Sequence, residues 1–214
     1  MAATGLFLVS FLVIHAGINA CIFANDGGIM FNKAAHFMGA SMVIRIMEIG
    51  LFAGFFIHII QGLVLTFQNK SKRKIGYAVN RPGANSSWYS RSMGLLGTIL
   101  LLFLIIHWWH FWVPSRITHA GLDKPVFYDG VEMHNMFGLM RETFKELWVV
   151  VLYVVACGSL AFHLIHGFHS AFRTFGVSNK KYLNLLFDIG MVYAVIISLV
   201  FALMPVAMYT GWIK

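Results

Sequence analysis

Most of the ten histidines in this sequence lie within long apolar stretches, where an ionisable side chain is costly to place. Imidazole nitrogens bind transition metals, transfer protons, and form hydrogen bonds between helices. Interhelical hydrogen bonding could explain any one of these histidines, but four separate stretches each contain at least one. The pattern therefore favours a buried metal or proton-transfer site. The histidines concerned are His15, His58, His107, His110, His163, His166 and His169.

The apolar stretches themselves predict an integral membrane protein. Of the 214 residues, 59% are hydrophobic and only 11% are charged, whereas a soluble domain carries about 25% charged residues. Each stretch reaches the length of about 20 residues that a bilayer core requires. We predict one all-α domain over residues 1–214, an integral membrane bundle of five transmembrane helices whose first four form a four-helix bundle. The predicted helices are Thr4–Ala24, Met42–Phe67, Met93–Val113, Trp148–Phe172 and Leu185–Tyr209.

Basic residues concentrate in two loops on one side of the predicted bundle. The net charge is +8, and its distribution indicates membrane orientation rather than nucleic-acid binding. The positive-inside rule then predicts a cytoplasmic N-terminus and a periplasmic C-terminus in a bacterial inner membrane. The first stretch lacks the basic segment of a signal peptide, so we expect a retained helix. The basic loop residues are Lys70, Lys72, Arg73, Lys74, Arg81, Arg91, Arg173, Lys180 and Lys181.

Two histidines are expected at one depth in the inner half of the membrane. His58 lies nine residues before Phe67, and His163 lies nine residues before Phe172. A helix rises about 1.5 Å per residue, so each lies about 14 Å from the cytoplasmic end of its helix. Because the two belong to different helices, they could face each other in an inner layer.

A second pair is expected in the outer half. His107 lies fourteen residues past Met93, about 21 Å into its helix, and His15 lies eleven residues past Thr4, about 16 Å. His110, at about 26 Å by the same rise, is too near the outer interface to match His15. Each pair could hold the iron of one planar macrocycle inside a four-helix bundle, and the sequence thus favours two b-type haems.

Small residues agree with this hypothesis. Gly62 follows His58 by four residues and Gly167 follows His163 by four, so each glycine shares a helix face with its histidine. A ring held by a histidine needs a flat surface one turn away, although small residues also serve ordinary helix packing. His166 and His169 are expected nearer the cytoplasm, as contacts to propionates or other polar groups.

Two other kinds of chemistry remain open from the residues alone. Membrane di-iron or copper oxidases also use histidine clusters, but usually nearer the membrane surface than the four candidates here. A transporter could use intramembrane histidines to carry protons.

Four segments resemble the cytochrome b membrane anchor of succinate:quinone oxidoreductases. They are Ala34-Ala35-His36-Phe37-Met38-Gly39, Arg45-Ile46-Met47-Glu48, Tyr89-Ser90-Arg91-Ser92-Met93-Gly94, and Phe162-His163 through Phe172. The chain is most similar to the single-chain, five-helix, two-haem type found with succinate dehydrogenase and fumarate reductase in bacteria such as Bacteroidetes. The similarity covers nearly the whole chain, except for the short basic segment that often precedes the first helix in this family.

The resemblance implies specific ligands, partners and activity. His15 and His107 would bind the outer haem, and His58 and His163 the inner haem. A flavoprotein subunit with FAD and an iron–sulfur subunit would dock on the cytoplasmic face. Electrons would pass between iron–sulfur clusters and menaquinone, while the dicarboxylate chemistry takes place on a partner. Anchors of formate dehydrogenases or hydrogenases remain the same-chemistry alternative.

Two surfaces complete the sequence-based expectations. Glu48 and Arg45 share a helix face in the outer half, as an ion pair or as part of a quinone site in which Glu48 exchanges protons. His36 and Trp112 could line the same pocket. On the cytoplasmic side, we expect part of the basic loop to contact the iron–sulfur subunit and an inner haem propionate, through Trp88, Tyr89 and Arg91.

Overall fold

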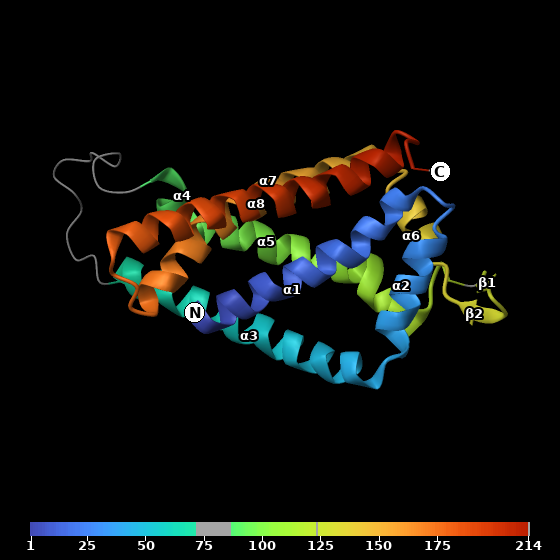
Figure 1. Cartoon of the computed structure of the whole chain (residues 1–214), viewed down its shortest axis with the longest axis horizontal. Coiled ribbons are helices and arrows are strands. Elements are labelled where there is room, and N and C mark those ends of the chain that lie inside the picture. The colour runs from blue at the N-terminus through green and yellow to red at the C-terminus, as the bar shows by residue number, and fades with distance from the viewer. Residues whose placement is uncertain (72–86, 123, 214) are drawn as a thin grey trace.

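The computed structural model describes residues 1–71, 87–122 and 124–213. Five long helical segments, each apolar enough to cross a membrane, dominate the fold, and they confirm the predicted all-α membrane bundle (Figure 1). The long helices are α1 (Ala2–Ala20), α3 (Met42–Ser71), α5 (Met93–His107), α7 (Leu147–Thr174) and α8 (Lys180–Tyr209). A short helix, α4 (Trp88–Arg91), precedes α5, and a 3₁₀ turn (Cys21–Ala24) extends α1.

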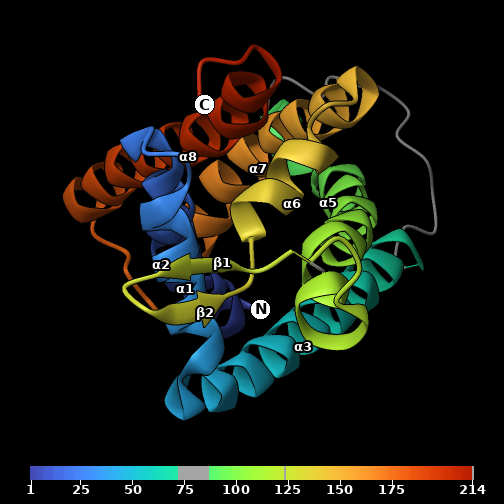
Figure 2. The same ribbon diagram turned by 90° about the vertical axis from the view of Figure 1, so that its right-hand side faces the viewer.

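The first four long helices form a ring in which each contacts the next. α1 packs against α3, α3 against α5, α5 against α7, and α7 against α1. Consequently α1 lies diagonally opposite α5, and α3 lies diagonally opposite α7. The fifth long helix, α8, lies outside this ring against α7 and α1, as the end-on view in Figure 2 shows.

The third membrane segment is longer than the sequence predicted. Instead of ending at Val113, the helix continues from α5 through two π-helical turns, Trp108–Trp112 and Pro114–Thr118. Pro114 has no backbone N–H to bond the carbonyl four residues earlier, and a wider π-turn accommodates this loss without ending the helix. The segment therefore reaches Thr118.

The fifth helix also begins earlier than predicted, at Lys180 rather than Leu185. The side chain of Asn179 accepts a hydrogen bond from the backbone N–H of Lys181 and caps the helix start. This polar first turn extends the helix beyond its apolar stretch, which is why hydropathy alone placed the boundary too late.

A small cap covers the end of the bundle opposite the N-terminus. It consists of α2 (Ile29–Ala40), the hairpin of β1 (Val126–Tyr128) and β2 (Val131–Met133), and α6 (Met136–Thr143). Figure 2 shows these elements in front of the long helices. The N-terminus lies at the opposite end with the α7–α8 turn, and the C-terminus lies at the cap end (Figure 1).

A buried asparagine links three elements of the cap. Asn32 of α2 is 1% exposed, and its Oδ1 accepts a hydrogen bond of 2.9 Å from the backbone N–H of Phe137 in α6. Its Nδ2 donates to the hydroxyl of Tyr128 in β1 and to Oδ1 of Asn135. Because both ends of the amide are bonded, the buried polar group stabilises the cap.

Many of the buried hydrophobic residues form two clusters, and α3 contributes a buried residue to neither. One cluster joins the cap to α7 and α8, around Phe144 and Tyr153, and the other joins α1, α7 and α8, around Ala16 and Ala194. Only 6% of the most apolar window of α3 is buried, against 39% for α7. Hence α3 meets its neighbours mainly through partly exposed histidine and aromatic side chains and through the backbone at glycines.

Candidate functional site

His58 of α3 and His163 of α7 face each other near the end of the bundle opposite the cap. Their ring centres lie 6.3 Å apart, with an angle of 68° between the ring planes. Because α3 and α7 are diagonal partners in the four-helix ring, the two imidazoles meet across its central axis. The structure thus brings together the two histidines that the sequence placed at one depth.

His15 of α1 and His107 of α5, the other diagonal pair, also meet across the axis, nearer the cap. Their ring centres lie 5.8 Å apart, at an angle of 88°. Phe11 stacks on the His15 ring and Phe103 on the His107 ring, at centre-to-centre distances of 5.2 and 5.6 Å. Aromatic side chains therefore surround this second pair.

The two pairs form separate layers along the bundle. Thr4 contacts His58, and eleven residues of α1 separate Thr4 from His15, a rise of about 16 Å. On α7, ten residues separate His163 from Tyr153, whose ring lies 6.1 Å from that of His107, a rise of about 15 Å. Both helices thus give the same spacing, and a hydrocarbon core of about 30 Å accommodates one layer in each half.

The separation within each pair fits one metal ion held between the two rings. A metal–imidazole bond is about 2 Å long and the ring centre lies about 1 Å further out, so two imidazoles on opposite sides of one metal have centres about 6 Å apart. The observed distances of 6.3 and 5.8 Å match this value. The residues present therefore fit an iron with two axial histidines.

The Nδ1 atoms of the four histidines differ in their surroundings. Nδ1 of His58 lies 3.2 Å from the hydroxyl of Thr4, while Nδ1 of His15 lies 3.4 Å from the side-chain nitrogen of Asn19. Within the described part of the chain, the buried Nδ1 atoms of His107 and His163 have no hydrogen-bond partner. A buried polar atom without a partner is uncommon and indicates a functional site or a missing ligand.

Glycines line the layer of His58 and His163. At Gly167 a Cβ atom would meet open space, and at Gly62 it would meet only the end of the Met1 side chain. A Cβ at either predicted glycine would therefore not contact a histidine ring. Sequence reasoning missed two more: a Cβ at Gly5 would lie 3.5 Å from Cε1 of His58, and one at Gly97 would lie 3.7 Å from Cε1 of His163.

The other membrane histidines contact tyrosine or phenylalanine. Nδ1 of His110 lies 3.0 Å from the hydroxyl of the buried Tyr153. The His166 ring lies 6.4 Å from that of Tyr89, and the His169 ring 5.3 Å from that of Phe187.

No three metal-ligating side chains converge within the described residues. A di-iron or copper centre held by protein side chains needs such a group. A haem iron takes four ligands from its own ring and needs only two from the protein, so paired histidines suit it better.

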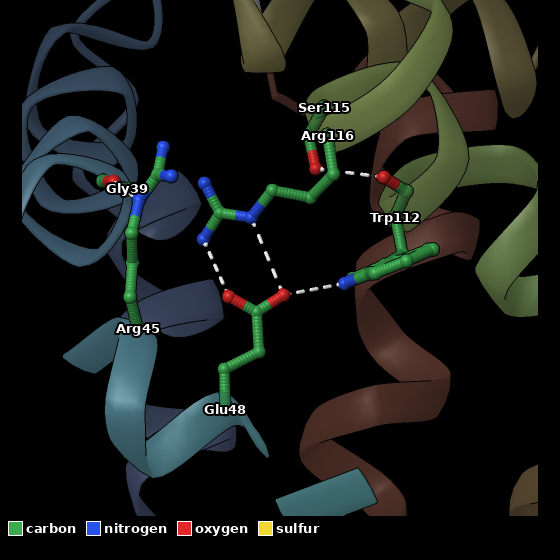
Figure 3. A network of polar contacts seen from close by, with 6 residues as sticks. All are labelled: Gly39, Arg45, Glu48, Trp112, Ser115 and Arg116. Atoms are coloured by element: carbon green, nitrogen blue, oxygen red, sulfur yellow. Dashed lines mark hydrogen bonds and ion pairs between the residues drawn. The ribbon is translucent and has the colours of Figure 1, made fainter.

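A polar cluster lies at the cap end of α3. Both carboxylate oxygens of Glu48 accept hydrogen bonds from the Arg116 guanidinium, and Trp112 Nε1 also donates to Glu48, as Figure 3 shows. The Arg116–Glu48 ion pair has an N–O distance of 3.1 Å, and about a fifth of each side chain is exposed. Arg116 reaches Glu48 because the third segment continues past Val113.

The Arg45–Glu48 ion pair considered from the sequence is replaced by this cluster. Arg45 is exposed, and its Nε donates instead to the carbonyl of Gly39, at 3.3 Å. His36 lies one turn before Gly39 on α2, half-buried, and Gly39 also borders the Arg116 guanidinium. Of the residues expected in the outer pocket, Trp112 contacts Glu48, and Arg116 is the partner that the sequence did not predict.

The segment predicted to contact the soluble subunits is described only in part. Trp88 of α4 is 54% exposed and packs edge-on against Phe162, while the Tyr89 ring stacks near the same phenylalanine. Arg91 lies exposed at the end of α4. The basic residues Lys72, Arg73, Lys74 and Arg81 lie outside the described residues.

No protein-family model, curated protein sequence or solved structure shows a significant match to this chain. The family resemblance of the four sequence segments therefore stays a prediction.

Proposed function

We propose that this chain is the dihaem cytochrome b anchor of a succinate:quinone oxidoreductase. In this role it transfers electrons between an iron–sulfur subunit on the cytoplasmic face and menaquinone near the outer face. The observation that carries the proposal is the pair of facing histidines in each of two layers, with ring centres 6.3 and 5.8 Å apart.

The two diagonal pairs divide the ligand roles. His58 and His163 hold the inner haem b, and His15 and His107 hold the outer one. When bound in this way, haem b supplies one-electron transfer. The protein's own task is to fix the two layers about 15 Å apart and to exclude water with phenylalanine side chains such as Phe11 and Phe103.

The sparse packing of α3 supports the same assignment. This helix contributes no residue to either buried cluster, and it presents His58 toward His163 of α7. Ligand-filled bundles are built in this way, with the cofactor completing the core.

Glu48 is the proposed proton-exchanging group of the quinone site. Reduction of menaquinone takes up two electrons and two protons, so a site near the outer haem needs a group that delivers protons to the quinone oxygens. Arg116 and Trp112 hold the Glu48 carboxylate in place through three hydrogen bonds. Each cycle of protonation and deprotonation of this carboxylate would deliver one of the two protons to the quinone.

The assignment to succinate rather than another donor depends on the sequence resemblance. The partners are then a flavoprotein with FAD and an iron–sulfur subunit, and the membrane is a bacterial inner membrane with the N-terminus in the cytoplasm. Basic residues around the described turn of α7 and α8, including Arg173, Lys180 and Lys181, support this orientation.

Purification of the complex from its native membrane tests the proposal. A tag on the exposed cap should co-purify one flavoprotein and one iron–sulfur protein, and the preparation should reduce a menaquinone analogue with succinate. A variant with both His58 and His163 replaced by alanine serves as the control for electron transfer through the anchor.

Different outcomes separate the alternatives. Co-purification of a molybdenum or nickel–iron enzyme instead of the flavoprotein would assign the chain to a formate dehydrogenase or hydrogenase. A chain that purifies without soluble partners and without haem would contradict the whole proposal.

A further inference from the structure

The hydroxyl of Thr4 on α1 contacts the ring of His58 on α3, at 3.2 Å from Nδ1. The two residues are 54 positions apart in sequence, so this contact exists only in the folded bundle. At the neighbouring Gly5, a Cβ would lie 3.5 Å from the same ring. The first turns of α1 therefore run directly beside the back of the His58 imidazole.

The hydrogen bonds of Thr4 determine which atom donates in this contact. A hydroxyl has one proton to give, and Thr4 lies 3.0 Å from the carbonyl oxygen of Met1 and 3.4 Å from Oε1 of Gln61. The Met1 carbonyl can only accept and is the nearer of these two oxygens, so the Thr4 proton is assigned to it, in the usual manner of a threonine bonding back along its helix. Toward His58 the hydroxyl is then an acceptor.

The consequence for His58 is a defined tautomer. A neutral imidazole carries one proton, and a hydrogen bond from Nδ1–H to Thr4 places that proton on Nδ1. Nε2 then keeps its lone pair free, which is the condition for binding a metal. In the opposite arrangement, with Thr4 donating to Nδ1, the proton would lie on Nε2 and would have to leave before that atom could bind a metal.

The other candidate ligands lack this arrangement. Nδ1 of His163, across the same layer, is buried and has no partner within the described residues, and the same is true of His107 in the other layer. Nδ1 of His15 faces an amide nitrogen that also donates to the His15 carbonyl at 2.8 Å. Of the four candidate ligands, His58 is thus the one whose Nδ1 lies beside a hydroxyl.

We infer that Thr4 is a positioning residue that fixes the tautomer and raises the electron-donating power of His58 as a metal ligand. An acceptor on Nδ1–H increases the basicity of a coordinated imidazole and so stabilises the more positive, ferric state of the iron. The inner of the two proposed haems therefore has a lower midpoint potential than it would have without Thr4. This inference rests on the proposed function, because it concerns the metal held by His58 and His163.

A redox titration of the full-length chain in its complex tests the role of Thr4. Thr4→Val removes the hydroxyl and keeps the shape, and Thr4→Ser keeps the hydroxyl. Thr98→Val is the matched control, because the exposed Thr98 hydroxyl bonds back to Gly94 of its own helix, at 2.8 Å, and to no other described residue. The inner haem is identified as the one that His163→Ala removes.

We expect Thr4→Val to shift the midpoint potential of the inner haem upward and to leave the outer haem unchanged. Thr4→Ser and Thr98→Val should both titrate as the unmodified chain does. Loss of the inner haem from Thr4→Val but not from Thr4→Ser would also support the inference, because Thr4→Ser keeps the hydroxyl that Thr4→Val lacks.

Two results would overturn the inference while leaving the proposed function intact. One is a Thr4→Val chain with both haems and unchanged potentials, and the other is equal loss of the inner haem from Thr4→Val and Thr4→Ser. An unmodified chain that binds no haem would instead overturn the proposed function, and this inference with it.

Discussion

The imidazole rings of His58 and His163 face each other across the centre of the four-helix ring, 6.3 Å apart and from diagonally opposite helices. Side chains on neighbouring helices meet through ordinary packing, but diagonal helices bring their side chains together only at the bundle axis. Two histidines in that position have no apolar packing role that leucine would not fill better.

Replacement of either inner histidine should remove one haem of the two. In His58→Ala or His163→Ala the iron loses an axial ligand, so we expect haem content to fall by about half. Pyridine haemochrome analysis measures this directly. His134→Ala, which alters a ring stacked near that of His119 at the cap, is the control and should keep both haems. Retention of two haems with unchanged spectra in the inner variants would contradict the assignment.

His110→Ala should keep both haems even though His110 lies only one turn from His107. Its ring is stacked on Tyr153 and hydrogen-bonded to the tyrosine hydroxyl, so its Nδ1 atom already has a partner. The buried hydroxyl loses its partner, and we expect a stability cost of about 1–3 kcal/mol in a denaturation experiment. Loss of the outer haem in this variant would transfer the ligand role from His107 to His110.

Glu48→Gln should impair the reaction with menaquinone and leave the other electron-transfer steps intact. The amide keeps most of the shape but cannot exchange a proton, so both haems and the reduction of a soluble dye by succinate should remain. Most of the menaquinone turnover should be lost. Glu142→Gln, which alters an exposed ion pair with Lys145 in the cap, is the matched control. Normal quinone turnover in Glu48→Gln would leave Glu48 as a structural partner of Arg116.

The iron–sulfur subunit should contact the N-terminal end of α5 rather than the cap. A photo-crosslinking residue at the exposed position of Trp88 should link to this subunit in the intact complex. The same residue at Phe127, which is 65% exposed in the hairpin, should not. Cross-links from the cap alone would place the soluble subunits at the opposite end and reverse the proposed orientation.

Asn32→Ala should destabilise the cap. The substitution leaves the buried N–H of Phe137 without its acceptor, which costs about 1–3 kcal/mol. Lys33→Ala removes only an exposed ion pair with Asp129 and should cost about 1 kcal/mol or less. Chemical denaturation in detergent compares the two variants, and equal effects would show that the Asn32 network does not hold the cap.

Hydropathy was sufficient to identify the five membrane spans. The depth of each histidine along its span was sufficient to group the histidines into pairs. A helix has a fixed rise, so the position of His58 or His163 along an apolar stretch gives its level before any contact is known. The depths calculated in this way group the histidines into the same pairs that meet across the diagonals of the four-helix ring. It could not reveal Thr4 or Gly97 beside these rings, because contacts across the bundle depend on how the helices are rotated.

The partner of Glu48 escaped prediction for a local reason. With the third segment ended at Val113, Arg116 was assigned to a loop and Arg45 was the nearest basic residue on the same face. The π-helical turns at Pro114 instead carry the helix to Thr118, and Arg116 then lies one turn beyond Trp112, opposite Glu48. The Asn32 network was equally hidden, since it joins residues about 100 positions apart.

The haem content and ligand field of the purified chain test the two-haem proposal most directly. The measurement combines pyridine haemochrome analysis with low-temperature electron paramagnetic resonance of the oxidised protein. We predict two haems b per chain, both low-spin with two histidine ligands, because each histidine pair has the spacing of an iron held from both faces. A chain that retains its helices but contains no haem, or an iron signal that requires non-haem ligands, would contradict the proposal.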